Sequence, residues 1–338
     1  MAIKIIRSIC YFSKKPSDET VKKLSRISDL LIKNDYEIQT KRICASNITI
    51  KELGEKISDK SIFLNVGTIE MEKVSEQIAD IFGKNNIAFN LDLSQIEITK
   101  KHTDVLFKII NSHPEKTFRF SYVFNNAPSS PFFPSGNYEK EGYSLGFQLT
   151  DLSDNCNTLE EWFNEIRKVF NEINLLLKED KDFLGIDSSI APLFSGKSSL
   201  RDFIRKIGYD FSYSVLTDNY LRITEFIKKE NPCPVGLCGL MFPCLEDFGL
   251  AEEYEKGNFS IERNLFLSLH SGLGVDTYPI GINENQERIV NILKTIQGLS
   301  NKYNKSLSCR FVSDGNAKIG EKTDFKNQYL KDVIIREL

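Results

Sequence analysis

The chain has 338 residues, 41% of them hydrophobic and 11% aromatic, and a formal net charge of −3. This composition supplies an apolar core and excludes a disordered chain, a collagen-like fibre and a small disulfide scaffold. A net charge so close to zero gives no basic surface for nucleic acid or an anionic membrane. A chain of this length predicts either two domains or one large α/β barrel.

The N-terminal segment and the cysteines predict a cytoplasmic protein. Arg7 interrupts the first apolar residues and no small-residue cleavage site follows, so we expect a strand there rather than a secretion signal. The longest uncharged segment, 120–138, contains several prolines and would not cross a membrane as a helix. The 7 cysteines are an odd number in a long chain, which favours reduced thiols.

The first third of the chain alternates short apolar runs with amphipathic segments. We expect strands at 3–12, 36–45, 62–66 and 87–93. Helices are expected from a cap at Ser17 to Leu31, and at 49–58, 72–83 and 99–111. This repeated strand–helix order predicts a parallel sheet covered by helices.

The middle of the chain departs from this order. A strand at 118–126 leads into a proline-rich loop at 127–138 and a second strand at 143–150, and Asn157 to Glu160 form a capping signal for a long helix. The alternation then resumes, with strands at 183–190, 234–241, 274–280 and 307–313 and helices at 199–207, 214–228, 246–256, 261–268 and 284–302. No linker or composition shift divides these roughly ten strands, so one closed domain is an alternative to two.

A near-match to a phosphate-binding loop occurs at Ala191–Ser198, between an expected strand and an expected helix. The chemistry of such loops needs backbone N–H groups that converge on a phosphate. Pro192 lacks this group and Phe194 is bulky where the backbone must approach closely, so we interpret the match as a coincidence. We keep a weaker expectation that Gly196–Ser199, at the start of the following helix, binds a phosphate or a carboxylate. No glycine-rich dinucleotide fingerprint follows the first strand.

Polar residues inside otherwise apolar segments mark the candidate site, because parallel α/β proteins place their chemistry where strands end. Asp187 and Ser189 alternate along one strand face and would line a pocket or complete a hydrogen-bonded strand end. Glu246 and Asp247 are adjacent carboxylates. They would cap the following helix, or one would act as an acid, a base or a metal ligand with its pKa raised by the other.

Further charged positions need a buried partner or a ligand. Asp276 lies in an apolar strand, where a charge must be paired or ligated. Arg310 lies in the last strand and would meet Asp187, Asp276 or an anionic ligand. Arg42, near the N-terminus, would likewise need an acidic partner or an anionic ligand. His270, one of 3 histidines, is expected to be either a proton carrier or a hydrogen-bonded structural residue.

The loop at 127–138 carries Phe132 and Phe133 between prolines that fix its path. A rigid loop with these apolar side chains would serve as the wall or the lid of a pocket. The alternative is a plug that packs into the core of the protein.

Five segments together resemble an uncharacterised bacterial and archaeal family known as domain of unknown function seven-eleven, or uncharacterised protein family zero-two-one-zero. They are Thr40–Ile43, Ser130–Pro134, Gly185–Pro192, Met241–Asp247 and Gly274–Pro279, and they occur in the order of the family. The resemblance implies one ten-stranded α/β barrel over residues 1–338, similar to that of glycyl radical enzymes such as pyruvate formate-lyase, with a C-terminal tail from about residue 326. It implies no known reaction.

Two departures limit what this resemblance implies. Glycyl radical enzymes carry a characteristic glycine loop near the C-terminus, whereas this chain has Arg310–Asp314 in its last strand, so we expect no radical chemistry. After Pro279, relatives tend to have a Pro-Gly-Asp sequence where this chain has Gly281, Ile282 and Asn283. If that acid serves catalysis or metal binding in relatives, this chain would lack the activity.

The favoured hypothesis is an enzyme that acts on a small anionic metabolite inside the barrel. The residues that would supply acids, metal ligands and contacts to a carboxylate or phosphate are Asp187, Glu246, Asp247, Asp276, Arg42 and Arg310. Oxygen ligands with few histidines suit Mg²⁺ or Ca²⁺ better than zinc. The alternatives are a non-catalytic sensor that uses the same pocket and a scaffold without a ligand. A homo-oligomer stays open, and no nucleic acid or membrane partner is expected.

Overall fold

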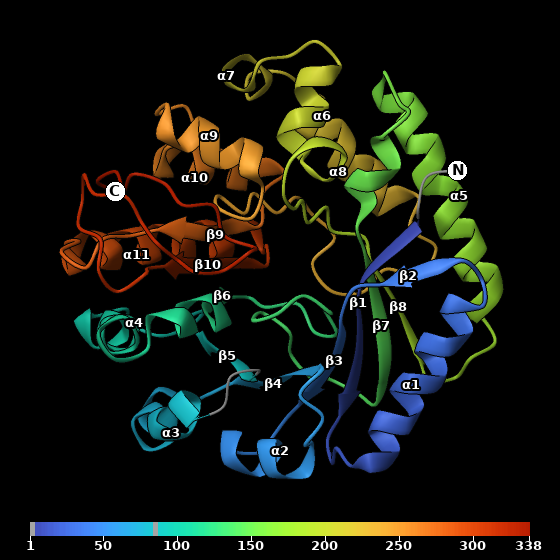
Figure 1. The fold of residues 1–338 in the computed structure, drawn as a ribbon, viewed down its shortest axis with the longest axis horizontal. Coiled ribbons are helices and arrows are strands. Elements are labelled where there is room, and N and C mark those ends of the chain that lie inside the picture. The colour runs from blue at the N-terminus through green and yellow to red at the C-terminus, as the bar shows by residue number, and fades with distance from the viewer. Residues whose placement is uncertain (1–3, 84–86) are drawn as a thin grey trace.

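The computed structural model describes residues 4–83 and 87–338. Its strands are β1 (Lys4–Ser13), β2 (Tyr36–Ile38), β3 (Lys41–Ala45), β4 (Ile62–Thr68), β5 (Ile87–Asp92), β6 (Phe120–Phe124), β7 (Gly142–Phe147), β8 (Phe183–Asp187), β9 (Gly274–Pro279) and β10 (Leu307–Val312). They form one curved, ten-stranded sheet in the order β8-β7-β1-β3-β4-β5-β6-β10-β9, with β2 paired to β1 (Figure 1). The fold is therefore a mixed α/β fold built on a single sheet.

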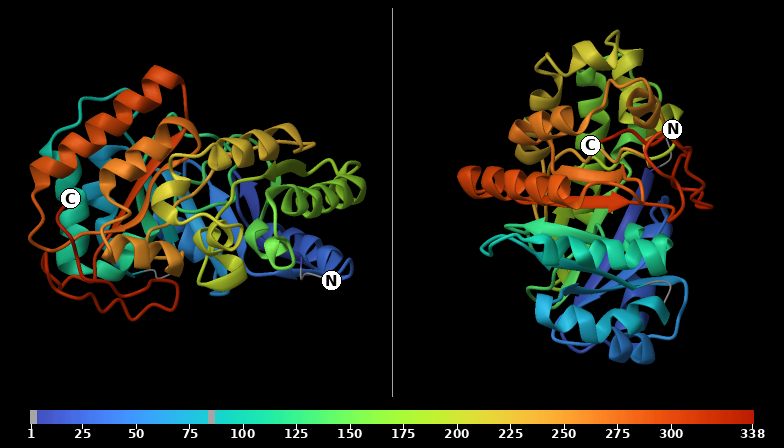
Figure 2. Two further views of the ribbon diagram at one scale, coloured as in Figure 1. Left: turned by 90° about the horizontal axis from the view of Figure 1, so that it is seen from above. Right: turned by 90° about the vertical axis from the view of Figure 1, so that its left-hand side faces the viewer.

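Helices surround this sheet on its outer side (Figures 1 and 2). The α-helices are α1 (Asp18–Ile32), α2 (Ile50–Lys56), α3 (Met71–Gly83), α4 (Lys100–Ser112), α5 (Leu159–Leu177), α6 (Leu200–Lys206), α7 (Phe211–Ser214), α8 (Asn219–Lys229), α9 (Phe248–Glu255), α10 (Ile261–His270) and α11 (Gln286–Tyr303). The 3-10 helices are η1 (Pro114–Arg119), η2 (Leu149–Ser153) and η3 (Gly196–Ser198). The N-cap of α5 is Thr158 rather than the expected Asn157, since the Thr158 side chain accepts the Glu161 N–H. No helix within the described ranges is long and apolar enough to cross a membrane.

The sheet is mixed rather than parallel. β1, β3, β4, β5 and β6 run parallel, as the alternation in the first third of the chain predicts. β7 is antiparallel to β1 and β10 is antiparallel to β6, so β7 to β10 run the opposite way. The parallel order predicted from the first third does not extend across the borders with this second set, whose strands pair in parallel with each other. The reason is that the loop at 127–138 joins β6 to β7 without a crossover helix and reverses the chain.

Two expected elements are divided in the structure. The strand expected at 36–45 becomes β2 and β3, which both pair with β1. Between them the Thr40 hydroxyl donates to the Arg7 carbonyl at 2.6 Å, so a side chain takes the place of a backbone donor. The helix expected at 214–228 begins only with α8, because a turn separates it from the short α7.

The segment expected as a strand at 234–241 forms isolated bridges only. Gly236 interrupts it with a φ of +70°, which is outside the range of extended backbone. Leu240 bridges to Ile190 beyond β8 and to Gly272 before β9, so the segment lies between the two edge strands without joining the ladder. The sheet is therefore not closed by paired strands. The count of ten strands agrees with expectation only because the divided strand replaces this one.

The proline-rich loop at 127–138 lies inside the curved sheet (Figure 1). Buried side chains on the inner face of the sheet donate to its backbone carbonyls: Ser8 to Pro131 at 2.9 Å, Asn65 and Asn90 to Pro134 at 3.1 and 2.9 Å, and Ser144 to Ser129 at 2.8 Å. Gly146 leaves room for Phe132, because an added Cβ would lie 2.6 Å from the ring. The loop therefore fills the end of the interior at which β4 and β5 finish.

Candidate functional site

A cavity of about 620 Å³ lies inside the sheet, at the end where β3 to β6 begin. Its wall contains the second residue of each of these strands: Arg42, Phe63, Ala88 and Ser121. Because β7 to β10 run the opposite way, this is also the end at which those strands finish. The cavity thus lies where the first set of strands begins, which the sequence does not predict, and its wall also includes Gly274 and Asp276 of β9 and Ser308 and Arg310 of β10.

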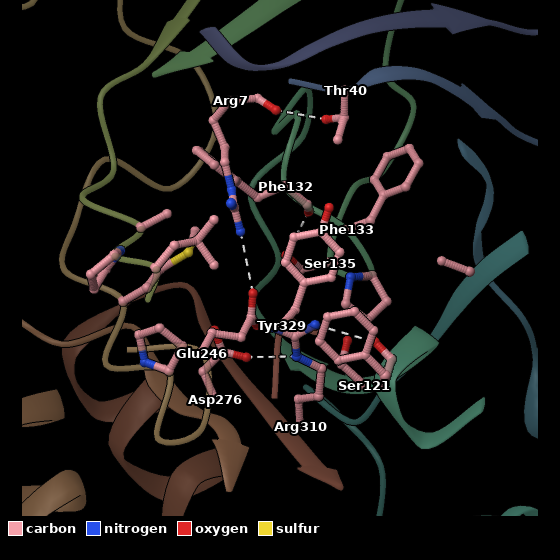
Figure 3. Close-up of a pocket in the computed structure, with 18 of the residues that line it drawn as sticks. Arg7, Thr40, Ser121, Phe132, Phe133, Ser135, Glu246, Asp276, Arg310 and Tyr329 are labelled. Atoms are coloured by element: carbon pink, nitrogen blue, oxygen red, sulfur yellow. Dashed lines mark hydrogen bonds and ion pairs between the residues drawn. The ribbon is translucent and has the colours of Figure 1, made fainter. Parts of the chain in front are cut away.

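Arg310 on β10 holds two carboxylates in this cavity (Figure 3). Its Nε lies 2.7 Å from Asp276 Oδ1, and its Nη2 lies 2.6 Å from Glu246 Oε1. Arg7 on β1 binds the other oxygen of Glu246, with Nη2 and Oε2 3.2 Å apart. All four side chains are between 6% and 17% exposed. Of the two partners that the sequence offered for Arg310, Asp276 makes the contact and Asp187 does not.

Burial and mutual contact shift the pKa values of this group. Burial raises the pKa of Glu246 above its ordinary value, and Arg310 opposes that rise. Burial lowers the pKa of Arg7, against the effect of Glu246. For Arg310, burial acts to lower the pKa, but Asp276 and Glu246 raise it above its ordinary value. Burial therefore disfavours the charged forms of these side chains, and their contacts with one another favour the charged forms.

Two more arginines line the cavity without an ion pair in the described part of the chain. Arg42 donates from Nε to the Thr40 hydroxyl at 3.0 Å and from Nη1 to the Pro131 carbonyl at 3.1 Å. Burial lowers the pKa of Arg42 to about 9, with Arg7 adding to the effect, and lowers that of Arg119 to about 10. Both side chains therefore remain cations at neutral pH.

Phenylalanine rings orient three of the four cavity arginines. The distances from guanidinium carbon to ring centroid are 5.1 Å for Arg42 and Phe133, 5.2 Å for Arg119 and Phe63, and 4.9 Å for Arg310 and Phe118. A ring face holds the plane of a guanidinium while its N–H groups stay available to acceptors. Phe132 and Phe133 both line the cavity, so the loop at 127–138 is at once a plug of the interior and a wall of the pocket.

The C-terminal segment at 327–329 also lines the cavity. Tyr329 stacks on Phe194 with ring centroids 5.7 Å apart. The backbone N–H of Lys331 donates to the Leu245 carbonyl at 3.0 Å, which ties the segment to the residue before Glu246. The tail expected from about residue 326 is therefore packed against the cavity.

Asp187 and Ser189 lie outside the wall of the cavity. The Asp187 carboxylate is fully buried and accepts five hydrogen bonds: from the hydroxyls of Ser130 (2.7 Å) and Ser189 (2.6 Å), and from the N–H groups of Ser189 (3.1 Å), Leu237 (3.0 Å) and Cys238 (3.1 Å). These contacts join the loop at 127–138, the end of β8 and the turn at 236–239. Of the two interpretations that the sequence left open, this geometry matches the hydrogen-bonded strand end.

Asp247 lies outside the cavity although its neighbour Glu246 lies within it. As the N-cap of α9, its Oδ1 accepts the N–H groups of Gly249 and Leu250 at 3.1 and 3.2 Å. The Ser199 hydroxyl donates to the same oxygen at 2.5 Å. Burial raises the pKa of Asp247 to about 6, against these hydrogen bonds. The adjacent carboxylates therefore divide into a helix cap and a cavity residue.

His270 and the segment Gly196–Ser199 also lie away from the cavity. The Nδ1 of His270 lies 2.8 Å from the Ser271 hydroxyl, and burial, with Lys305 adding to it, lowers the pKa of the imidazole. The N–H of Gly196 donates to Asp202 Oδ2 at 2.7 Å. A carboxylate of the chain itself thus takes the place where an anion was expected.

The acidic side chains Glu246 and Asp276 each contact an arginine, and they do not surround an open position that a metal ion could fill. Among residues 4–83 and 87–338, no three histidine, cysteine or acidic side chains are placed to hold a metal ion. Arg310 binds both Glu246 and Asp276, the acids expected to serve as ligands, and its charge would repel a cation. The arrangement therefore suits an anion better than Mg²⁺ or Ca²⁺.

Among the cavity residues that sequence reasoning missed are Arg7, Arg119 and Tyr329. Arg7 lies in an apolar strand, which is the signal that singled out Arg310, so the same rule applied evenly would find it. Arg119 precedes a strand and Tyr329 lies in an irregular segment, where neither periodicity nor spacing marks a site. Their places in the wall depend on tertiary packing alone.

The fold and the cavity define an α/β protein with an internal pocket rich in arginine. A family model described as "Uncharacterised ACR (DUF711)" matches residues 67–327, and the chain belongs to this family, which confirms the resemblance carried by the five segments. A comparison with curated proteins returns no match. The matched range includes Glu246, Asp276 and Arg310, whereas Arg7 and Arg42 precede it.

Proposed function

We propose that the protein is an enzyme that binds a small anionic metabolite in this cavity and converts it with the help of Asp276. The observation that carries the proposal is a pair of buried carboxylates held by arginines in a cavity with largely apolar walls. Buried ionisable groups in such a cavity are typical of small-molecule sites. Asp187, Asp247 and His270 have no role in this proposal, because they do not line the cavity.

Asp276 is the side chain best placed to exchange a proton with a ligand. Its Oδ1 binds Arg310, whereas its Oδ2 has no hydrogen-bond partner within the described ranges. Both oxygens of Glu246 are engaged, by Arg310 and by Arg7, so Glu246 positions these two arginines. Asp276 therefore serves as the proposed general base or acid, with Arg310 balancing its charge.

We also propose that the sheet and the segment at 234–241 form one barrel, similar to that of glycyl radical enzymes but without radical chemistry. Support comes from Leu240, which bridges towards both edge strands and spans the gap between them. None of the described residues that line the cavity is a cysteine, so a thiol relay of the kind used in radical enzymes has no donor there.

The proposed setting is the cytoplasm, with a small anion as the principal partner. The unpaired state of all 7 cysteines supports a reducing compartment. The net charge of −3 supports neither nucleic acid nor an anionic membrane as a partner.

The second candidate function is non-catalytic binding of the same ligand. It is favoured by the engagement of both Glu246 oxygens, because ion pairs of this kind hold a pocket in shape without leaving a free base. The departure at Gly281–Asn283 does not add to this alternative. Asn283 lies outside the wall, where its Oδ1 accepts the Ile319 N–H at 2.9 Å, so an acid lost there removes no group from the cavity.

Mass spectrometry of the protein incubated with a mixture of carboxylates and phosphate monoesters tests the two functions. If one of these compounds is turned into a product, we expect Asp276→Asn to abolish formation of that product. The melting temperature should stay near that of the wild type, since asparagine keeps an acceptor for Arg310. The matched control is Asp182→Asn, at a surface carboxylate 2.9 Å from Lys23, which should keep the activity. Binding without any product in the wild type would establish the alternative, and a large loss of stability in Asp276→Asn would mark a structural acid.

A further inference from the structure

The charged side chains of the cavity do not balance. Arg310 pairs with Glu246 and Asp276, Arg7 pairs with Glu246, and Arg42 pairs with neither acid. With both acids ionised, three guanidiniums face two carboxylates, so this central group carries one surplus positive charge. The two other charged residues of the wall, Arg119 and Glu37, are opposite in sign and leave that surplus unchanged. The surplus lies on Arg42, a half-buried side chain on the wall of a cavity, where a cation without an acidic partner favours a ligand of opposite charge.

Arg42 is held in place by neutral groups only. The Thr40 hydroxyl and the Pro131 carbonyl accept from its Nε and Nη1 at 3.0 and 3.1 Å, and the Phe133 ring lies under its plane, 5.1 Å from the guanidinium carbon. A guanidinium has more N–H donors than these contacts use. Arg42 is therefore a fixed cation on the wall of the cavity with donors available to a ligand.

Arg7 lies beside Arg42 and also has a donor to spare. The Thr40 hydroxyl links the two, since it donates to the Arg7 carbonyl at 2.6 Å and accepts from Arg42 Nε. The Nη2 of Arg7 binds Glu246, whereas its buried Nε has no hydrogen-bond partner in the part of the chain that the structure describes. Buried N–H donors are rarely left without an acceptor. This Nε is enclosed by the protein and out of reach of a ligand, but the Nη1 of Arg7 also has no partner among the described residues and is not enclosed. The two guanidiniums, which are close enough for Arg7 to lower the pKa of Arg42, thus both offer N–H groups to the cavity.

We propose that the cavity binds an organic anion with a single carboxylate, and that this carboxylate lies between Arg42 and Arg7. One negative charge cancels the surplus, and the two oxygens of a carboxylate match the fork of a guanidinium. A phosphate monoester carries close to two charges at neutral pH and would replace the surplus with an excess of opposite sign. This inference rests on the proposed function and narrows its substrate class.

The remaining residues of the wall determine which chemical groups the ligand can carry beyond its carboxylate. Apolar side chains from separate segments line the cavity beyond the arginines: Phe118, Phe194, Met241 and Leu273. Asp276 stays available to a polar group of the ligand. Arg119 has its own ring, Phe63, and takes no part in the balance of the central group. Polar side chains, among them Ser121, Ser308 and Gln328, also line the cavity, so the substrate class is a monocarboxylate whose body is apolar or aromatic in part.

Thermal unfolding and calorimetric titration with three matched probes test this assignment. The probes are phenylacetate, phenylacetamide and benzyl phosphate at neutral pH and equal ionic strength, which differ in charge and share one apolar body. We expect phenylacetate to bind at least about tenfold more tightly than the other two. In Arg42→Gln this preference is expected to disappear, and the protein without probes should melt about 2 °C higher than the wild type, because an unpaired charge has been removed.

Arg167→Gln is the matched control. Its guanidinium also lies over a ring, Phe226 at 5.3 Å, but it pairs with Glu230 outside the cavity. This variant is expected to keep the preference for phenylacetate. If Arg42→Gln does not fold, Arg42→Lys replaces it, because lysine keeps the charge and loses the fork: phenylacetate should then bind more weakly than to the wild type and still better than the amide.

Each other outcome overturns a different part of the account. Tighter binding of benzyl phosphate that depends on Arg42 would overturn the single charge and leave the anion site standing. Phenylacetate binding that is unchanged in Arg42→Gln, or in Arg42→Lys an amide bound as well as phenylacetate, would overturn the position of the carboxylate. If no probe binds and Arg42→Gln is no more stable than the wild type, the inference fails. The proposed enzyme alone fails if phenylacetate binds as expected and no carboxylate is converted.

Discussion

The turn around Asp187 and the cavity around Arg42 are both polar and inside the protein, but they use their hydrogen-bonding capacity differently. The oxygens of Asp187 receive five donors, all from the chain itself. Arg42 has only neutral partners, and with the neighbouring ion pairs it leaves one positive charge over. A polar group whose partners all lie in the chain stabilises the fold, whereas surplus charge in a cavity points to a ligand.

The largest expected effect is a loss of stability at Asp187, which tests whether this residue is structural. Asp187→Ala removes the acceptor of five buried hydrogen bonds, and we expect the free energy of unfolding to fall by about 5 kcal/mol. Urea denaturation measures the loss. Asp182→Ala, which removes a half-exposed carboxylate bound by Lys23 and the Tyr11 hydroxyl at 2.9 and 3.1 Å, should lose only about 1 kcal/mol. Equal losses in the two variants would contradict the structural role of Asp187.

The next effect concerns Arg310, the cation at the centre of the cavity. Arg310→Met leaves Glu246 and Asp276 without it, and we expect a loss of about 4 kcal/mol at neutral pH. Removing the cation raises the folded-state pKa of Glu246 further, so the native state binds a proton more readily than the unfolded state. The variant is therefore most stable at acid pH and loses stability as the pH rises. Urea denaturation at several pH values measures this, and a loss that is the same at every pH would contradict it.

A smaller effect tests how tightly the turn around Asp187 is packed. Gly236 has a φ of +70°, and an added Cβ would lie 2.3 Å from Asp187 Oδ2, so Gly236→Ala should lose about 2 kcal/mol. Gly298, inside α11, has nothing within 4 Å of an added Cβ. Gly298→Ala should therefore gain about 0.5 kcal/mol through helix propensity. Thermal unfolding compares the two, and effects of the same sign would argue against a tight turn.

The smallest expected effect is the pH dependence contributed by Glu246 in the wild type. Burial raises its pKa above the ordinary value of 4.5, so the native state takes up a proton more readily than the unfolded state. The resulting stabilisation is present below that ordinary value and is lost as the pH rises through the raised pKa. Glutamine does not titrate, so Glu246→Gln should flatten the profile of unfolding free energy against pH. An unchanged slope would show that Glu246 does not titrate as its burial requires.

The fold could be predicted from the sequence wherever the signals are local. Alternating apolar and amphipathic segments gave β1 to β6 and their helices, because periodicity reflects the environment of each segment by itself. The direction of β7 to β10 could not be predicted, since strand pairing joins residues that are distant in the chain. The segment at 234–241 has the composition of a strand, but its place between two edges depends on the turn at Gly236.

The candidate site could be predicted in the same partial way. A charge in an apolar strand demands a partner, and that rule identified Asp276 and Arg310, which meet at 2.7 Å. The same rule could not separate Asp187 from Asp276, because both lie in apolar strands and only the surrounding donors distinguish them. Tyr329 enters the cavity from an irregular segment that carries no local signal.

The stability of the wild type and of Arg42→Gln, measured by thermal unfolding across a titration with phenylacetate, tests the surplus charge most directly. Without the anion, Arg42→Gln should melt at the higher temperature, because it lacks the unpaired cation. At saturating phenylacetate the order should reverse, since only the wild type gains a carboxylate partner for Arg42. A wild type that is the more stable protein at every concentration, or equal shifts in both proteins, would contradict the account.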